Sequence, residues 1–168
     1  MRQFVGDAII SALIGYRDTD WAVRNSATMT FSAAMLRVID ADKNAENVEV
    51  ERDQTNGNAI TARELFRSYP SLASCLLCMI TEESSKIMSK DALHPSLFPI
   101  LLLISRLQPA IYSSADIDVD ETLSRFINPI LRCLGHVHHK VRMMAARALT
   151  VLCSQYSDNK EVVLLVIQ

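Results

Sequence analysis

The sequence has few of the residues that build phosphate-binding loops, and it has no long apolar run. Only four of its 168 residues are glycine, and none of them falls in a GxGxxG or GxxxxGK pattern. We therefore expect no nucleotide or S-adenosylmethionine site, no cofactor and no small-molecule substrate. The longest apolar run, LFPILLLI, is far shorter than the roughly 20 residues that cross a bilayer, so we expect no membrane partner.

Acidic residues are missing from one long segment near the C-terminus. No Asp or Glu occurs between Thr122 and Ser157, which argues against paired-carboxylate or Ser-His-Asp catalysis there. The same segment carries five cations: Arg125, Arg132, Lys140, Arg142 and Arg147. A phosphate backbone could lie on such a surface. The alternative is structural, with Arg142 bracing a turn and the other cations on a solvated helix face.

The cysteines are few and lie in apolar helical patterns. They are Cys75, Cys78, Cys133 and Cys153. Because the N-terminus lacks a secretory signal, we expect reduced thiols and a cytosolic or nuclear protein, with the cytosol preferred.

Two short motifs resemble zinc-ligand pairs. Cys75 and Cys78 form a CxxC, and Cys133 and His136 form a CxxH, which together could supply four ligands. However, the CxxC lies on one apolar helix face without a glycine or proline turn, so buried thiols are favoured and no metal is expected. The histidines of GHVHHK could bind a metal or titrate near neutral pH, but an exposed polar turn is the simpler interpretation.

The pattern predicts an all-α protein of about seven helices. Hydrophobic residues make up 49% of the chain, proline and glycine are scarce, and no segment alternates as a strand would. We expect one helix to end near Gly15, a second to run from an N-cap at Asp20 to about Ile39, and a capping box at Thr61 to open a short helix ended by Pro70. Residues 40–60 are predicted to form one long, flexible acidic loop. Further helices are expected over about 71–84, 95–107, 118–135 and 138–156, followed by a tail helix.

An internal repeat favours a HEAT/armadillo-like α-solenoid. DTDWAVRNSATMTFSAA and HVHHKVRMMAARALTVL align with Val23-Arg24 over Val141-Arg142. A turn followed by Val-Arg-x-x-Ala resembles the second helix of a HEAT repeat. We expect Arg24 and Asn25 to brace the turns between helices. Residues 1–168 are thus predicted to be a single solenoid segment, and the apolar helices at both ends suggest part of a larger helical-repeat protein.

Four segments in the same order resemble one family. They are DWAVRNSATMTFSAAMLRV, TARELFRSYP, LHPSLFPILLLISRL and INPILRCLGHVHHKVRMMAARAL. The family is that of thyroid adenoma-associated protein and the yeast tRNA-methyltransferase auxiliary subunit, which carries a domain of formerly unknown function. Trp21, Arg24, Asn25 and Ser26 fall in its Trp-x-Val-Arg-Asn-Ser stretch. Arg142 and Arg147 fall in its Arg-x-x-Ala-Ala-Arg-Ala-Leu stretch.

The resemblance implies a non-catalytic scaffold. Family members partner a separate FtsJ-like ribose 2′-O-methyltransferase, which supplies the catalytic site, and direct it to the anticodon loop of tRNA. The candidate tRNA-binding residues are then Arg132, Lys140, Arg142 and Arg147. The family-motif residues with an expected structural role are Asp20, Trp21, Arg24, Asn25 and Ser26. The alternative function is a generic HEAT-type protein-interaction module without an RNA role.

Overall fold

Seven α-helices make up the part of the chain that the structure describes. The structure is a computed structural model, and it describes residues 3–40, 60–85, 95–109 and 117–154. The helices are α1 (Gln3–Gly15), α2 (Trp21–Asp40), α3 (Ala62–Ser68), α4 (Pro70–Ser85), α5 (Leu97–Ser105), α6 (Ile117–Cys133) and α7 (His139–Ser154). These residues contain no strand, and one isolated bridge joins Thr61 to Gln108. The prediction of an all-α fold is confirmed.

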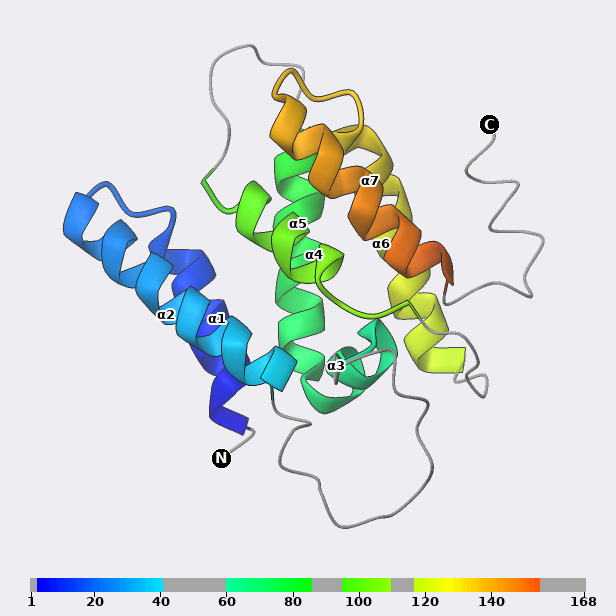
Figure 1. Cartoon of the computed structure of the whole chain (residues 1–168), viewed down its shortest axis with the longest axis horizontal. Helices are drawn as coiled ribbons and strands as arrows, with labels where there is room; N and C mark the ends of the chain where they lie inside the picture. The colour runs from blue at the N-terminus through cyan, green and yellow to red at the C-terminus, as the bar shows by residue number, and fades with distance from the viewer. Residues whose placement is uncertain (1–2, 41–59, 86–94, 110–116, 155–168) are drawn as a thin grey trace.

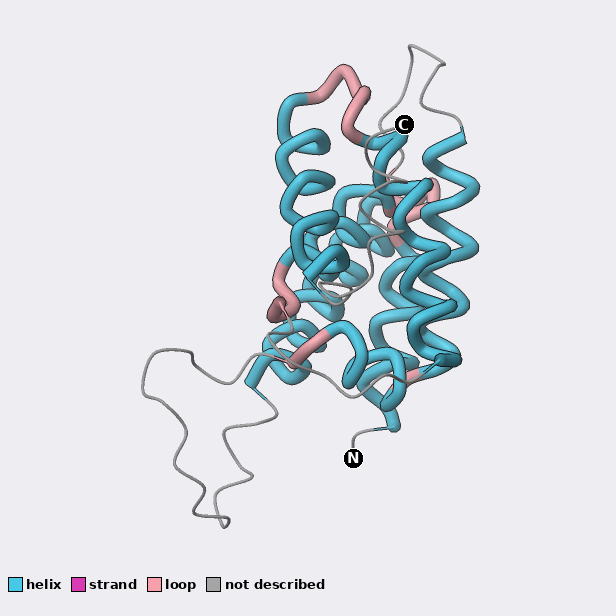
Figure 2. Tube along the Cα trace, turned by 90° about the vertical axis from the view of Figure 1, so that its right-hand side faces the viewer, coloured by secondary structure: helices cyan, strands magenta, loops and turns pink. Residues whose placement is uncertain are grey.

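The helices are arranged as stacked pairs in two layers. In Figure 1, α2, α5 and α7 lie in front of α1, α4 and α6. The main packing contacts join α1 to α2, α4 to α6, α5 to α7 and α6 to α7, and the short α3 packs against α6 and α4. Figure 2, turned by 90°, shows helices joined by short loops throughout these ranges. Each helix buries one face on its neighbours, as in an α-solenoid.

Local signals fix several helix ends where the sequence predicts them. Thr61 Oγ1 accepts a hydrogen bond from the Glu64 amide at 3.2 Å, and the Thr61 amide donates to Glu64 Oε2 at 2.9 Å. This is the capping box expected at the start of α3. Pro70 differs from the prediction in its role, because α3 ends at Ser68 and Pro70 is the first residue of α4. Proline is favoured at a first helical position because a backbone N–H there would have no hydrogen-bond partner within the helix, so its absence costs nothing.

The core runs continuously between the two layers. In α5, six of nine residues are buried, because both α4 and α7 pack against this helix. Phe66 of α3 stacks on Phe126 of α6, with ring centroids 5.2 Å apart. No described helix is long and apolar enough to cross a bilayer. The predicted acidic loop lies outside the described residues apart from Asp40, which ends α2, and Ile60; the predicted tail helix lies outside them entirely.

Candidate functional site

The turn before α2 is braced by the arginine of the Val-Arg motif. Arg24 Nη1 donates to the backbone carbonyl oxygens of Asp18 at 2.9 Å and Thr19 at 2.7 Å. Asp18 Oδ1 accepts from the Asp20 amide at 2.8 Å, and Asp20 Oδ1 accepts from the Ala22 amide at 2.7 Å. Asp20 is therefore the N-cap of α2, as predicted. The guanidinium satisfies two carbonyls that the tight turn leaves outside the helix.

The turn before α7 repeats this arrangement with a different side chain. Arg142 Nη1 donates to the carbonyl oxygens of His136 and Val137, both at 2.8 Å. His136 Nδ1 accepts from the His138 amide at 3.0 Å, in the place that Asp18 Oδ1 takes in the first turn. The internal repeat read from the sequence is thus a repeat of hydrogen bonds as well as of residue types.

The surroundings of the His136 imidazole favour its neutral form. Burial lowers the pKa of His136, and the neighbouring His138 ring and the Arg142 guanidinium lower it further. The two imidazole rings are stacked, with centroids 5.2 Å apart. A neutral imidazole is required here because Nδ1 acts as an acceptor, which a protonated ring could not do.

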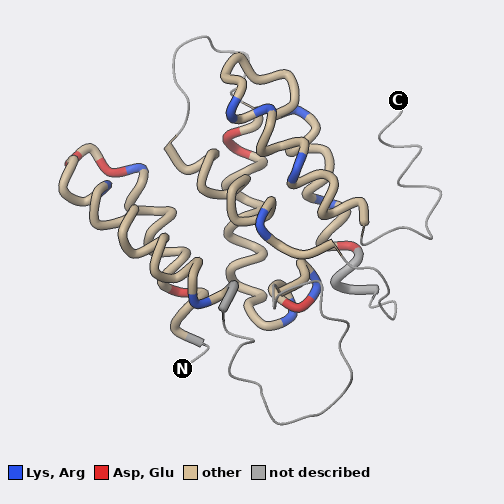
Figure 3. Tube along the Cα trace, viewed as in Figure 1, with Lys and Arg blue, Asp and Glu red and all other residues tan. Residues whose placement is uncertain are grey.

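The four candidate tRNA-binding residues lie on α6 and α7 but differ in availability. Arg132, near the end of α6, and Lys140 and Arg147 of α7 are exposed. Arg142 is half-buried and engaged with the turn carbonyls. Figure 3 shows blue lysine and arginine positions along these helices. The role of the four in tRNA binding stays a prediction, whereas the bracing role that the sequence offers for Arg142 is observed.

The remaining family-motif residues lie at the exposed start of α2. Trp21 is 70% exposed, and Asn25 and Ser26 are also exposed. The predicted bracing role is observed for Arg24, and for Asn25 it stays a prediction. Trp21 is the largest apolar side chain on this surface.

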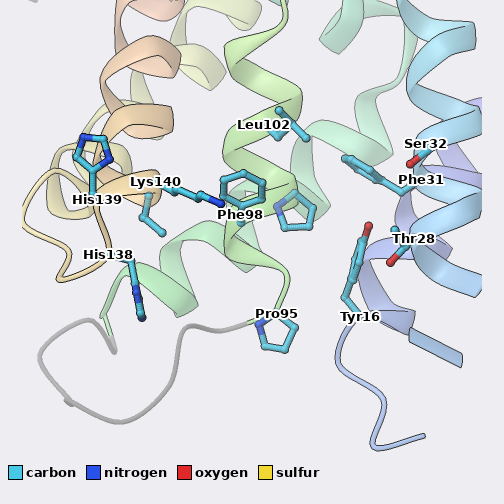
Figure 4. A pocket seen from close by; sticks show the side chains of 12 residues that line it. Tyr16, Thr28, Phe31, Ser32, Pro95, Phe98, Leu102, His138, His139 and Lys140 are labelled. Atoms are coloured by element: carbon cyan, nitrogen blue, oxygen red, sulfur yellow. The ribbon is translucent and has the colours of Figure 1, made fainter. Parts of the chain in front are cut away.

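A groove between the front helices was not predicted from the sequence. It has a volume of about 830 Å³ and runs between α2, α5 and the start of α7. Its lining residues are Tyr16, Thr28, Phe31, Ser32, Pro95, Phe98, Pro99, Leu102, His138, His139, Lys140 and Val141. The close view in Figure 4 shows α2 and Tyr16 on one side, α5 in the middle and α7 on the other. Of the candidate residues, only Lys140 lines it.

One end of this region is tied together by Arg17, which follows α1. Arg17 Nη2 lies 2.6 Å from Glu83 Oε1 and 3.1 Å from Glu82 Oε2 of α4. Arg17 Nε also donates to Ser96 Oγ, at the start of α5, at 3.4 Å. The Glu83 side chain is 0% exposed, so a buried carboxylate of α4 joins the first helix pair, α1 and α2, to the helices that follow.

The zinc-ligand pairs do not come together as a metal site. Within the described ranges, no three His, Cys, Asp or Glu side chains are grouped so that they could hold a metal. Burial raises the pKa of Cys133 to about 12 and also raises that of Cys75 and Cys153. Cys133 Sγ donates to the carbonyl of Pro129 at 3.3 Å, as a buried thiol in a helix does.

Comparison with known proteins identifies relatives over almost the whole chain. The family described as "Trm732, C-terminal TPR repeats" matches residues 24–167. The chain is 35% identical over 153 residues to the human "tRNA (32-2'-O)-methyltransferase regulator THADA" and 31% identical over 153 residues to that of Gallus gallus. It is 28% identical over 157 residues to the "tRNA (32-2'-O)-methyltransferase regulator trm732" of Schizosaccharomyces pombe. No solved structure matches.

The relatives are far longer than this chain. The aligned region takes in 87% of the chain but 7% of the human and chicken proteins, and 91% of the chain but 10% of the yeast protein. These proteins are named as regulators of a methyltransferase, which confirms the prediction of an auxiliary, non-catalytic family. The HEAT/armadillo prediction and the TPR description agree on a stack of helix pairs. The chain belongs to the family of Trm732 C-terminal TPR repeats.

Proposed function

We propose that this chain is part of a non-catalytic scaffold that supports ribose 2′-O-methylation in the anticodon loop of tRNA. In this role the scaffold binds tRNA and an FtsJ-like methyltransferase, and the enzyme supplies the S-adenosylmethionine site. The observation that carries the proposal is the match of 87% of the chain to proteins named as regulators of a tRNA (32-2′-O)-methyltransferase. We also propose that it acts in the cytosol.

The distribution of charge supports a contact with tRNA near α7. Lys140 and Arg147 are exposed on this helix, and Arg132 is exposed at the end of the helix before it. No acidic residue lies between positions 122 and 157, so no carboxylate from this segment opposes a phosphate there. Neutralising a phosphate releases counterions, which makes such binding weaken as salt rises.

The first test concerns the partner and the product. The full-length protein is purified from its own cells, and the co-purifying proteins and the methylation of anticodon-loop riboses are measured. We expect an FtsJ-like methyltransferase to co-purify and the 2′-O-methyl group to disappear when the gene is deleted. If no such enzyme binds and the methylation persists, the scaffold proposal is wrong.

The second test concerns RNA binding. The affinity for an unmodified tRNA transcript is measured against salt for the full-length protein and for an Arg132→Ala/Lys140→Ala/Arg147→Ala variant. Because each lost phosphate contact lowers the slope of log K against log salt by about 0.7–0.9, a clearly shallower slope is expected. Arg142 is left intact, since its loss would disturb the turn.

The matched control removes three exposed cations outside the acid-free segment, in an Arg37→Ala/Arg67→Ala/Arg106→Ala variant, and its slope should stay closer to that of the wild type. Equal slopes for the wild type and the first variant would favour a protein-interaction module without an RNA role. Circular dichroism and thermal unfolding establish that both variants are folded.

A further inference from the structure

The groove between α2, α5 and α7 has three chemically different sides. Tyr16, Thr28 and Ser32 place three hydroxyl groups on the α2 side, and in Figure 4 the oxygen atoms of all three are grouped there. Phe98, Pro99 and Leu102 of α5 form an apolar floor. His138, His139 and Lys140 form the opposite side, at the start of α7. An occupant that meets all three sides needs polar, apolar and anionic parts.

The charge of the groove selects an anionic occupant. None of its twelve lining residues is acidic, and Lys140 extends its amino group over the floor toward the Phe98 ring in Figure 4. The positive end of the α7 dipole opens on the same side and adds to the attraction for a negative group. An anion bound beside Lys140 would therefore lie next to an aromatic ring.

The size of the groove indicates more than a single ion. About 830 Å³ lies in the range of 300–1,000 Å³ that is typical of sites for organic ligands. Half-buried Phe98 and half-buried Tyr16 leave part of each ring accessible on facing sides of this space. RNA-binding proteins use accessible aromatic rings of this kind to stack unpaired bases, and hydroxyl groups to bond base edges.

We propose that this groove binds unpaired nucleotides of an RNA. A base lies on the α5 floor against Phe98, its polar edge faces the hydroxyl groups on the α2 side, and its phosphate lies beside Lys140. The proposal rests on the tRNA-binding function above and assigns a place to it. Arg147 continues the path, because it lies seven residues after Lys140, which is about two turns or 10 Å further along α7.

A peptide of a partner protein is the competing occupant, and the groove favours RNA for two reasons. Only one side of the groove is positively charged and attracts an anion, which fits the single phosphate of a nucleotide. The accessible floor offers an aromatic ring beside a cation, which fits a base next to its own phosphate. A peptide would need an acidic residue placed at that same point.

The decisive variant fills the groove without touching the core. Ser32 is exposed and lines the groove, so Ser32→Trp places an indole in its mouth. Ala33 is the next residue of α2, is also exposed and does not line the groove, so Ala33→Trp is the matched control. Binding of the full-length protein is measured with three probes: an unmodified tRNA transcript, a single-stranded seven-nucleotide RNA, and a fully paired RNA duplex.

We expect Ser32→Trp to weaken binding of the single-stranded probe by at least ten-fold and Ala33→Trp to change it by less than two-fold. Phe98→Leu keeps the floor apolar but removes the aromatic ring, and should also weaken this probe by about ten-fold, as the loss of one base-stacking contact does. Lys140→Gln should lower the salt slope by about 0.7, the value for one phosphate contact in single strands. The duplex should be little affected by Ser32→Trp.

The outcomes separate this inference from the function on which it rests. If the wild type binds none of the three RNAs, both are overturned. If it binds tRNA but Ser32→Trp and Phe98→Leu bind as the wild type does, only the groove assignment is overturned. Loss of the methyltransferase partner in Ser32→Trp, with RNA binding unchanged, would overturn it in favour of a peptide occupant.

Discussion

The contact between Arg17 and Glu83 should be costly to break. Glu83 is fully buried in α4, and its Oε1 lies 2.6 Å from Arg17 Nη2, which comes from the loop after α1. Arg17→Met removes the cation and leaves the carboxylate in the protein interior. Breaking a buried pair in this way typically costs about 3–5 kcal/mol.

The low end of that range applies here, because the Arg17 side chain is 31% exposed and the pair is partly solvated at that end. We therefore expect a loss of about 3 kcal/mol in the free energy of unfolding. In a chain of this size that corresponds to a fall in Tm of roughly 6–12 °C. The second partner of Arg17, Glu82, is 46% exposed, so Glu82→Gln should cost less than about 1 kcal/mol.

The assay is urea unfolding of the wild type, Arg17→Met, Glu83→Leu and the double variant. Replacing both partners with apolar residues removes the buried charge as well, so the double variant should recover most of the loss seen in Arg17→Met. If Arg17→Met costs less than about 1 kcal/mol, the pair behaves as an exposed one, and it does not hold the first helix pair to the second.

Three further predictions concern the turns and the thiols. Arg24→Ala removes two charge-assisted hydrogen bonds, so it should lower stability by about 1–2 kcal/mol in urea unfolding while RNA affinity per folded molecule stays unchanged; a larger effect on affinity would mean that the turn before α2, which lies outside the groove, also contacts RNA. The pKa of His136 is lowered from 6.5 on folding, so the unfolded chain binds more protons below that value, and stability should fall as pH drops from 6.5 toward 5. His136→Asp, which supplies the acceptor that Asp18 provides in the other turn, should show a smaller fall over the same range; an equal fall would assign the pH dependence elsewhere. Burial raises the pKa of Cys133 to about 12, so iodoacetamide at pH 8 should label exposed Cys78 first and Cys133 only on unfolding, as read by mass spectrometry; early labelling of Cys133 would contradict its burial.

Helices and their ends could be predicted from the sequence because their signals are local. The capping box at Thr61 and the N-cap at Asp20 involve residues within three positions of one another. The Val-Arg-x-x-Ala repeat also placed two bracing arginines correctly, since each reaches carbonyls five and six residues away. The role of Pro70 was misread, because a proline after a short helix is compatible with both an end and a new beginning.

The groove and the buried ion pair could not be predicted in the same way. Arg17 and Glu83 are 66 residues apart, and nothing in either local pattern points to the other. The groove is lined by residues from three separate segments, within 16–32, 95–102 and 138–141, which meet only after the helix pairs have stacked. Its position depends on the spacing between α2 and α5, which is a property of packing and leaves no mark in either helix sequence.

Comparing the two copies of the Val-Arg motif shows how much an additional neighbouring helix contributes to the burial of the same residue. Val23 is 40% exposed on α2, which packs mainly against α1, whereas Val141 is 0% exposed on α7, which packs against both α6 and α5. The same residue in the same motif is thus half in water in one copy and wholly in the core in the other. Replacing each valine with alanine in turn and measuring the free energy of unfolding would show how much packing against a further helix adds to stability. Both variants would be compared with the same wild type. The cost of substituting a residue in this chain should therefore depend on how many helices pack around it, even where the sequence motif is the same.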